Sequence, residues 1–120
     1  TEDQKHVSDP ISVGSSVQEA KGFNPNRGSG CAVLDFDKIQ FPLVLRRWQK
    51  GDVFKPLGMQ GKKKVSDFFI DQKMSLFEKE NVWLLCSAGE IIWVVGHRID
   101  ERFKLVETTQ KVYLVQLNGA

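Results

Sequence analysis

Short apolar runs recur along the chain from residue 31 onward, and their pattern predicts β-strands. Residues 31–36 (CAVLDF) and 42–48 (PLVLRRW) are rich in apolar and β-branched side chains. Within the second run, Leu43 and Leu45 fall on one face of an extended chain, and Val44 falls on the other. Residues 11–13 (ISV) add a short edge strand before them.

Two hairpins are predicted in the C-terminal half. Residues 83–87 (WLLCS) and 90–95 (EIIWVV) are separated by Ala88-Gly89, which favours a tight turn. Both arms are almost wholly apolar, so we expect this hairpin to be central. Residues 102–106 and 111–117 (KVYLVQL) predict a second hairpin, since the latter alternates well.

Helical periodicity is confined to the middle of the chain. Residues 65–72 place Val65, Phe68 and Phe69 on one face. The pattern S-x-x-E at residues 75–78 is a capping box and predicts a second short helix that ends near Asn81. We therefore predict an α+β fold of mostly antiparallel strands with a central pair of short helices.

Composition divides the chain into two parts. The 120 residues are 41% hydrophobic and 27% charged, as in ordinary soluble domains. Residues 1–30 end in GFNPNRGSG and predict a linker or the tail of a preceding domain, so residues 31–120 form the domain proper. No apolar run approaches the length of a membrane span or a signal peptide, so we expect a cytoplasmic protein with no membrane partner. Cys31 and Cys86 are expected to be buried, reduced thiols.

Charge is distributed unevenly. The net charge is +2, yet residues 46–64 contain seven bases and one acid, a local charge of +6. One interpretation is a binding surface for an anionic polymer. The other is a solvated lysine-rich loop, which charge alone slightly favours.

Specific catalytic, metal and nucleotide motifs are missing from the sequence. Residues 58–64 (GMQGKKK) do not form a phosphate-binding P-loop, because Pro56 and Lys63 stand where Gly and Ser or Thr are required. His6 and His97 have no partner at metal-ligand spacing. We therefore predict no catalytic residue, no metal site and no cofactor in this chain.

A polynucleotide interface fits the basic segment better. Lys62–Lys64 directly precede the predicted helix, with Ser66 and Asp67 as candidate caps, and unpaired N–H groups at a helix start attract anions. Gly58 and Gly61 would let a phosphate approach the backbone closely. Such contacts bind the backbone without reading bases, which suits recognition of an A-form stem by its shape.

The run LRRWQKGDVFKPLGMQGKKKVSDFFIDQK, residues 45–73, resembles the C-terminal domain of tRNA(Ile)-lysidine synthetase. The order of Leu-Arg, Gly-Asp, Pro, Gly-Met, Gly, lysines and a Ser/Asp-Phe helix is shared. The likeness continues through residues 34–46 and through residues 83–105, with Gly-x-Arg-Ile-Asp-x-Arg, so it covers roughly residues 31–117. Ser75 and Lys79 depart from it, since the family often has Pro and Arg after the first helix.

The resemblance implies what the intact enzyme does. That family uses ATP and Mg to adenylylate C2 of the wobble cytidine in an isoleucine tRNA with a CAU anticodon, and lysine then attacks to form lysidine. The chemistry lies in an N-terminal catalytic domain with a Ser-Gly-Gly-x-Asp-Ser loop, which is not found in this sequence. The resemblance thus implies an inactive C-terminal part that binds the tRNA acceptor stem and cooperates with the catalytic domain.

By position, the resemblance implies contact with tRNA for Arg46, Arg47, Lys50, Lys55, Lys62, Lys63, Lys64 and Lys73. It implies a loop-shaping role for Gly51, Gly58 and Gly61. The alternative hypothesis is a protein–protein or interdomain docking module with a basic face.

Overall fold

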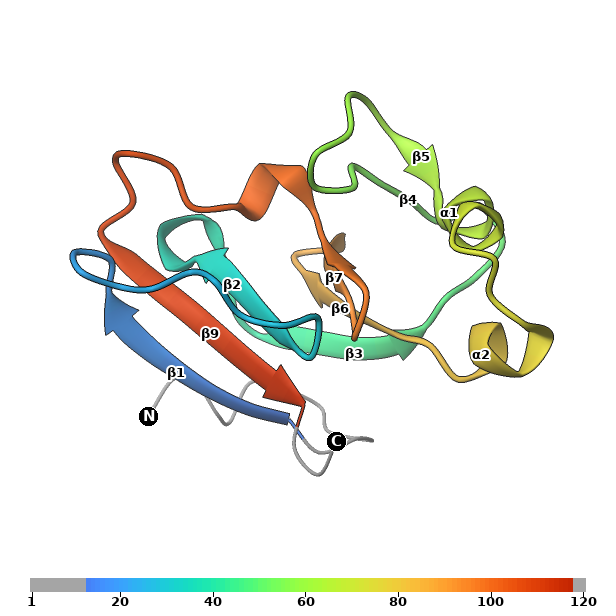
Figure 1. The fold of residues 1–120 in the computed structure, drawn as a ribbon, viewed down its shortest axis with the longest axis horizontal. Coiled ribbons are helices and arrows are strands. Elements are labelled where there is room, and N and C mark those ends of the chain that lie inside the picture. The colour runs from blue at the N-terminus through green and yellow to red at the C-terminus, as the bar shows by residue number, and fades with distance from the viewer. Residues whose placement is uncertain (1–12, 118–120) are drawn as a thin grey trace.

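The computed structural model describes residues 13–117, which form three antiparallel sheets and two short helices (Figure 1). The three-stranded sheet has the order β1–β9–β2 and comprises β1 (Val13–Glu19), β9 (Lys111–Leu117) and β2 (Cys31–Asp35). The four-stranded sheet has the order β3–β6–β7–β8 and comprises β3 (Leu43–Arg47), β6 (Trp83–Ser87), β7 (Glu90–Val94) and β8 (Arg98–Ile99). The remaining elements are β4 (Val53–Phe54), β5 (Lys63–Lys64), α1 (Val65–Asp71), α2 (Leu76–Glu80) and the 3₁₀ turns η1 (Phe36–Lys38) and η2 (Glu101–Phe103). The predicted α+β class is confirmed.

The β6–β7 hairpin is confirmed as a central feature of the four-stranded sheet. β6 pairs with β3 on one side and with β7 on the other. Ala88 and Gly89 both have positive φ angles, 50° and 82°, as a tight hairpin turn of this kind requires. Leu85 pairs with Trp93 and Cys86 with Ile91, so Ile92 is the extra residue of a β-bulge.

The second predicted hairpin is wrong. Residues 101–103 form η2, and β9 pairs with β1 and β2. The reason is local: the side chain of Asp100 accepts a hydrogen bond from the Arg102 amide and caps η2, which competes with an extended conformation. The partners of β9 come instead from the N-terminal part of the chain.

The N-terminal strand is longer than predicted. Residues 11 and 12 lie outside the described part, but β1 begins at Val13 and pairs with β9 along all seven residues, at the edge of the sheet. At least residues 13–19 thus share a sheet with β2 and β9. The division of the chain at residue 31 stays a prediction.

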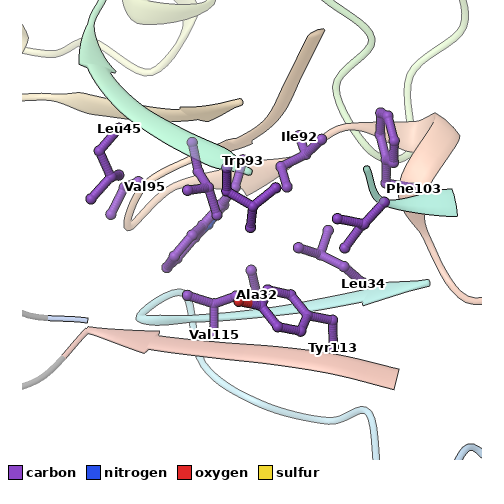
Figure 2. Packing of buried hydrophobic residues seen from close by; sticks show 12 residues of the cluster. Ala32, Leu34, Leu45, Ile92, Trp93, Val95, Phe103, Tyr113 and Val115 are labelled. Atoms are coloured by element: carbon purple, nitrogen blue, oxygen red, sulfur yellow. The ribbon is translucent and has the colours of Figure 1, made fainter. Parts of the chain in front are cut away.

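The main core lies between the two larger sheets (Figure 2). From the three-stranded sheet come Leu34 and Tyr113, both fully buried. From the other sheet come Leu45, Ile92 and Trp93. Because the bulge shifts the alternation of β7, consecutive residues Ile92 and Trp93 both join this core.

A second core lies on the opposite face of the four-stranded sheet and is covered by α1. Phe68 and Phe69 project from α1, as predicted, and pack with Phe54, Leu84 and Val94. The three layers are therefore sheet, sheet and helix, with α1 and α2 at the end away from β1 (Figure 1).

Helix capping follows the prediction in α2 but not in α1. In α2 the Ser75 hydroxyl accepts from the Glu78 amide at 3.1 Å, and the Glu78 carboxylate accepts from the Ser75 amide at 2.8 Å. This is the predicted capping box. The N-cap of α1 is Lys64, with no side-chain cap, so the prediction that Ser66 or Asp67 caps this helix is wrong.

The burial of Ile92 gives a direct test of the main core. Ile92→Ala is expected to lower the free energy of unfolding by about 2–5 kcal/mol, because a fully buried side chain leaves a cavity. Ile70 is 63% exposed on α1, so the matched change Ile70→Ala should cost less than about 0.5 kcal/mol. Urea denaturation followed by circular dichroism measures both. Equal losses would contradict the assignment of Ile92 to the core.

Candidate nucleic-acid interface

The glycine loop, residues 55–62, connects β4 to β5. Two ladder pairs, Val53 with Lys64 and Phe54 with Lys63, close its base. Gly58 and Gly61 have φ angles of 85° and 80°, in the left-handed region that side chains disfavour. The conformation of the loop therefore depends on glycine at both positions.

The glycine loop is fastened to a distant segment by backbone hydrogen bonds. The Leu57 amide donates to the Ile99 carbonyl at 3.0 Å. In return, the Glu101 amide donates to the Lys55 carbonyl at 2.6 Å. The end of β8 and the start of η2 thus hold the first half of the loop.

Asp100 fastens the same loop through its side chain. This residue is fully buried, and its carboxylate accepts from the Lys55 amide at 2.9 Å. It also accepts a hydrogen bond of 2.8 Å from the Arg102 amide and two hydrogen bonds of 2.9 Å from the Arg102 guanidinium. Every one of these bonds stabilises a buried charge, and the Asp100 hydrogen bond is first among the causes that raise the pKa of Arg102.

Glu101 supplies the last fastening. Its carboxylate accepts from the Gly58 amide at 3.0 Å and forms an ion pair with Lys104. The hydrogen bond from Lys104, followed by that from Gly58, lowers the pKa of Glu101 below its ordinary value. Glu101 therefore stays ionised at neutral pH and keeps the glycine loop in place.

Two hollows flank the glycine loop. The first has a volume of about 470 Å³ and is lined by Lys55, Gly58, Gly61, Glu101 and Lys104, among others. The second has a volume of about 250 Å³, and its lining includes Arg46, Gly51, Lys62, Glu90 and Arg102. Six of the predicted site residues thus line these hollows, namely Arg46, Gly51, Lys55, Gly58, Gly61 and Lys62.

Three of the predicted contact residues are engaged in the fold. Arg46 binds Asp52 through two hydrogen bonds of 2.9 and 3.0 Å. The Arg47 guanidinium lies 4.0 Å from the Trp83 ring centre. Lys63 forms an ion pair with Asp71 at 2.5 Å.

The Arg46–Asp52 pair is a fixed charge pair inside the turn before β4. Desolvation raises the pKa of Asp52, but the hydrogen bonds from Arg46 and from the Gln49 amide outweigh it, so the net pKa lies below its ordinary value. The hydrogen bond that Arg46 donates to Asp52 is the largest cause that raises the pKa of Arg46. The charge of Arg46 is therefore largely balanced before any ligand binds.

The other predicted cations are placed differently. All five of them lack a carboxylate partner within 4.0 Å among residues 13–117, namely Lys50, Lys55, Lys62, Lys64 and Lys73. All of these except the half-buried Lys55 are exposed. Their charge is available to an anionic ligand.

Residues 98–104 were missed as part of the site. The sequence contained a signal, because residues 98–102 (RIDER) place two acids between two arginines after an apolar strand. Nothing local to this segment indicated that Asp100 and Glu101 meet a loop more than forty residues earlier. Lys104, which lines the first hollow, was missed for the same reason.

Among residues 13–117, no group of three or more His, Cys, Asp or Glu residues is arranged to hold a metal ion. In the same range no helix has the length and apolar character needed to cross a membrane. Cys86 is buried and Cys31 is half-buried, and both are free thiols, so the expected full burial of Cys31 is wrong.

A known protein family matches most of the folded region. The family described as "TilS substrate C-terminal domain" matches residues 43–116, more than half of the chain. The chain belongs to this family. The resemblance drawn from residues 34–105 is confirmed.

Relatives within the TilS family are much longer than this chain. The tRNA(Ile)-lysidine synthase of Parabacteroides distasonis is 54% identical over 88 residues, which cover 73% of this chain and 20% of the relative. The enzyme of the same name from Bacteroides thetaiotaomicron is 40% identical over 105 residues, which cover 84% and 25%. The chain thus spans about a fifth to a quarter of the length of these curated relatives.

Solved structures share the fold. A crystal structure of a TilS C-terminal domain superposes with a TM-score of 0.73 at 23% identity, covering 90% of this chain and 85% of that one. An N-terminal fragment of the phenylalanyl-tRNA synthetase β-subunit from Pyrococcus horikoshii has a TM-score of 0.60 at 22% identity, covering 71% and 27%. At these identities the likeness concerns the fold alone.

Removal of the Asp100 carboxylate tests the fastening of the glycine loop. Asp100→Ala is expected to lower the free energy of unfolding by about 3 kcal/mol, because it leaves the Lys55 amide and Arg102 without their buried acceptor. Asp71→Ala removes an exposed ion pair and should cost less than about 1 kcal/mol. Urea denaturation compares the two, and amide hydrogen exchange at Lys55 reports on the loop. Unchanged exchange at Lys55 would contradict the fastening.

Proposed function

We propose that this chain is the tRNA-binding C-terminal domain of an ATP-dependent tRNA(Ile)-lysidine synthase. In this role the glycine loop and its lysines bind the phosphate backbone of the acceptor stem of an isoleucine tRNA. The observation that carries the proposal is a fastened glycine loop whose own lysines, Lys55 and Lys62, have no carboxylate partner within 4.0 Å among residues 13–117. Family membership supports the choice of tRNA as the anionic polymer.

Lysidine formation itself would belong to the remainder of such an enzyme. The relatives that carry the name are about four to five times longer than the matched region, and this chain corresponds to a small part of each. ATP and Mg would bind in that remainder, in a catalytic domain, and this chain alone would be inactive. Its contribution would be affinity and orientation of the tRNA.

We rank the eight proposed contact residues by their partners in the fold. The strongest candidates for phosphate contacts are the lysines that have no carboxylate partner within 4.0 Å among residues 13–117: Lys50, Lys55, Lys62, Lys64 and Lys73. Arg46, Arg47 and Lys63 would contribute mainly by holding the surface in shape. Contacts of this kind bind by charge and by A-form geometry and do not read the base sequence.

Replacement of two loop lysines tests this proposal. Lys55→Ala combined with Lys62→Ala is expected to weaken binding of an isoleucine tRNA transcript about tenfold and to reduce the slope of log affinity against log salt by about 2, roughly one per lost phosphate contact. Fluorescence anisotropy between 50 and 200 mM salt, concentrations chosen to span about physiological ionic strength, measures both quantities.

A charge-matched control excludes a general effect of lost positive charge. Lys21→Ala with Lys111→Ala removes two exposed lysines from the three-stranded sheet region, away from the glycine loop (Figure 1). This variant should bind tRNA like the parent chain. If both double variants lost affinity equally, or if heparin bound as well as tRNA, the proposed interface would be refuted.

A second candidate function, docking to another domain, is favoured by an apolar surface on the helices. Ile70, Leu76 and Phe77 are 63%, 70% and 74% exposed, unusual values for large apolar side chains. The longer relatives provide an occupant, because four fifths of the Parabacteroides enzyme lie outside the matched region. We propose that this helix surface packs against the catalytic part of the enzyme.

Polar substitution of this surface tests the docking proposal. Leu76→Ser with Phe77→Ser should weaken binding of this chain to the separately produced remainder of the Parabacteroides relative by about tenfold or more, because burial of two large apolar side chains is lost. Val106→Ser, at another exposed apolar residue, is the control. Isothermal titration calorimetry measures the affinity. Equal binding by all three chains would exclude the helix surface from the contact.

A further inference from the structure

A third cavity lies between the segment before β2 and the segment from β8 to η2, outside the basic surface described above. It has a volume of about 520 Å³, within the range of small-molecule sites. Its lining combines alternate residues from Pro25 to Val33 with residues 97–99, 104 and 105 and with Leu57 of the glycine loop. Segments far apart in sequence therefore build it together.

The walls of this cavity are mostly apolar. Val33 comes from β2, Ile99 from β8, and Leu57 and Leu105 from the two loops. The buried ring of Trp93 lies behind them. Such walls suit the flat face of an aromatic or heterocyclic group.

Basic side chains also line the cavity. Arg27, Arg98 and Lys104 line the cavity, together with the exposed His97, and none of the described lining residues is an Asp or Glu. Among the three cations only Lys104 has an ion-pair partner within residues 13–117. A ligand with an apolar plane and a negative charge would complement this arrangement.

The Arg27 guanidinium is held at the entrance by its neighbours. It lies 4.9 Å from the Phe23 ring centre, and its Nε donates to the Asn24 carbonyl at 3.0 Å. A guanidinium has five N–H donors, so this bond leaves further donors for an anion. Arg98 is turned differently, with its guanidinium 5.3 Å from the Phe68 ring centre.

The cavity adjoins the proposed RNA surface. Lys104 lines both this cavity and the first hollow beside the glycine loop. Leu57, in the wall of the cavity, directly precedes Gly58 in the hollow. A strand whose phosphate occupied the hollow would have its next unpaired base within reach of the cavity.

We propose that this cavity binds a single nucleotide, with its base against the apolar walls and its phosphate facing Arg27. The nucleotide is either an unpaired residue of a bound RNA or a free mononucleotide, which present the same chemistry. The RNA case rests on the proposed function of the glycine loop.

The RNA case is tested with two hairpins that share one stem, one blunt and one with a single-stranded extension of four nucleotides. The 120-residue chain should bind the extended hairpin about tenfold tighter than the blunt hairpin, the usual gain from stacking one base. Leu105→Glu, which places a carboxylate in the wall, should abolish that difference and leave blunt-hairpin affinity close to that of the control. The control is Val106→Glu, an equal charge change at an adjacent residue outside the cavity. Anisotropy at constant salt measures all affinities.

A second variant protects the test against misfolding of Leu105→Glu. Arg27→Ala alters only the entrance and should also reduce the preference for the extended hairpin, while Lys21→Ala, an exposed charge outside the cavity, should not. Circular dichroism confirms that each variant is folded.

The free-nucleotide case is tested with adenosine 5′-monophosphate alone. Titration of the parent chain should shift the amide resonances of Leu105 and Ile99. These shifts should be smaller in Arg27→Ala and unchanged in Lys21→Ala. This result would support the cavity as a mononucleotide site even if the extended hairpin were not preferred. Equal binding of both hairpins together with no response to the mononucleotide would overturn the inference. If the parent chain still bound the blunt hairpin, the proposed function would be unaffected. If the parent chain bound neither hairpin, the proposed function would be refuted, and the mononucleotide titration alone would decide whether the cavity binds a nucleotide.

Discussion

The buried carboxylate of Asp100 is the contact on which the basic surface depends. A fully buried charge is stable only when it is paired and hydrogen-bonded, and Asp100 meets this condition with the Lys55 amide and the backbone and guanidinium of Arg102. Arg102 in turn reaches Glu90 on β7 at 2.6 Å. One carboxylate thereby joins the glycine loop, η2 and the start of β7. The loop could not keep this position by its own sequence, because glycine-rich segments lose more conformational entropy on ordering than others do.

Charge counts along the sequence overstate what the basic segment offers to a ligand. Residues 46–64 have a formal charge of +6, which already includes Asp52, the partner of Arg46. Lys63 is balanced in addition by Asp71, which lies outside the segment. Lys104, far from the segment in sequence, adds a charge that is itself paired with Glu101. The surface that remains is a small number of unpaired lysines around a rigid loop. Such a surface favours backbone contacts over base readout, because lysine is a compact charge on a flexible stem and carries little geometric specificity.

Features set by neighbouring residues were predictable, whereas features set by distant pairing were not. The β6–β7 hairpin, the Ser75–Glu78 capping box and the buried face of α1 depend on a turn dipeptide, on four consecutive residues and on helical periodicity. The strand predicted at residues 102–106 failed because Asp100 caps a 3₁₀ turn there. The fastening of the glycine loop was invisible for the same reason, since Lys55 and Asp100 are 45 residues apart. Residues 98–102 were part of the family resemblance, but the resemblance assigned no role to them. Their role in holding the glycine loop is visible only in the three-dimensional contacts.

The main core and the basic surface are physically connected through the bulge in β7. Ile92 is the extra residue of that bulge, its side chain is buried in the main core, and its carbonyl accepts a hydrogen bond from the Asp100 amide at 2.9 Å. A regular β7 would place only one of the consecutive side chains Ile92 and Trp93 on the main-core side, because side chains alternate along a strand. The irregularity in the sheet therefore serves two purposes, since it fills the core with consecutive side chains and positions the carboxylate that orders the glycine loop. The glycine loop on the surface is thus connected to packing in the interior through Ile92 and Asp100.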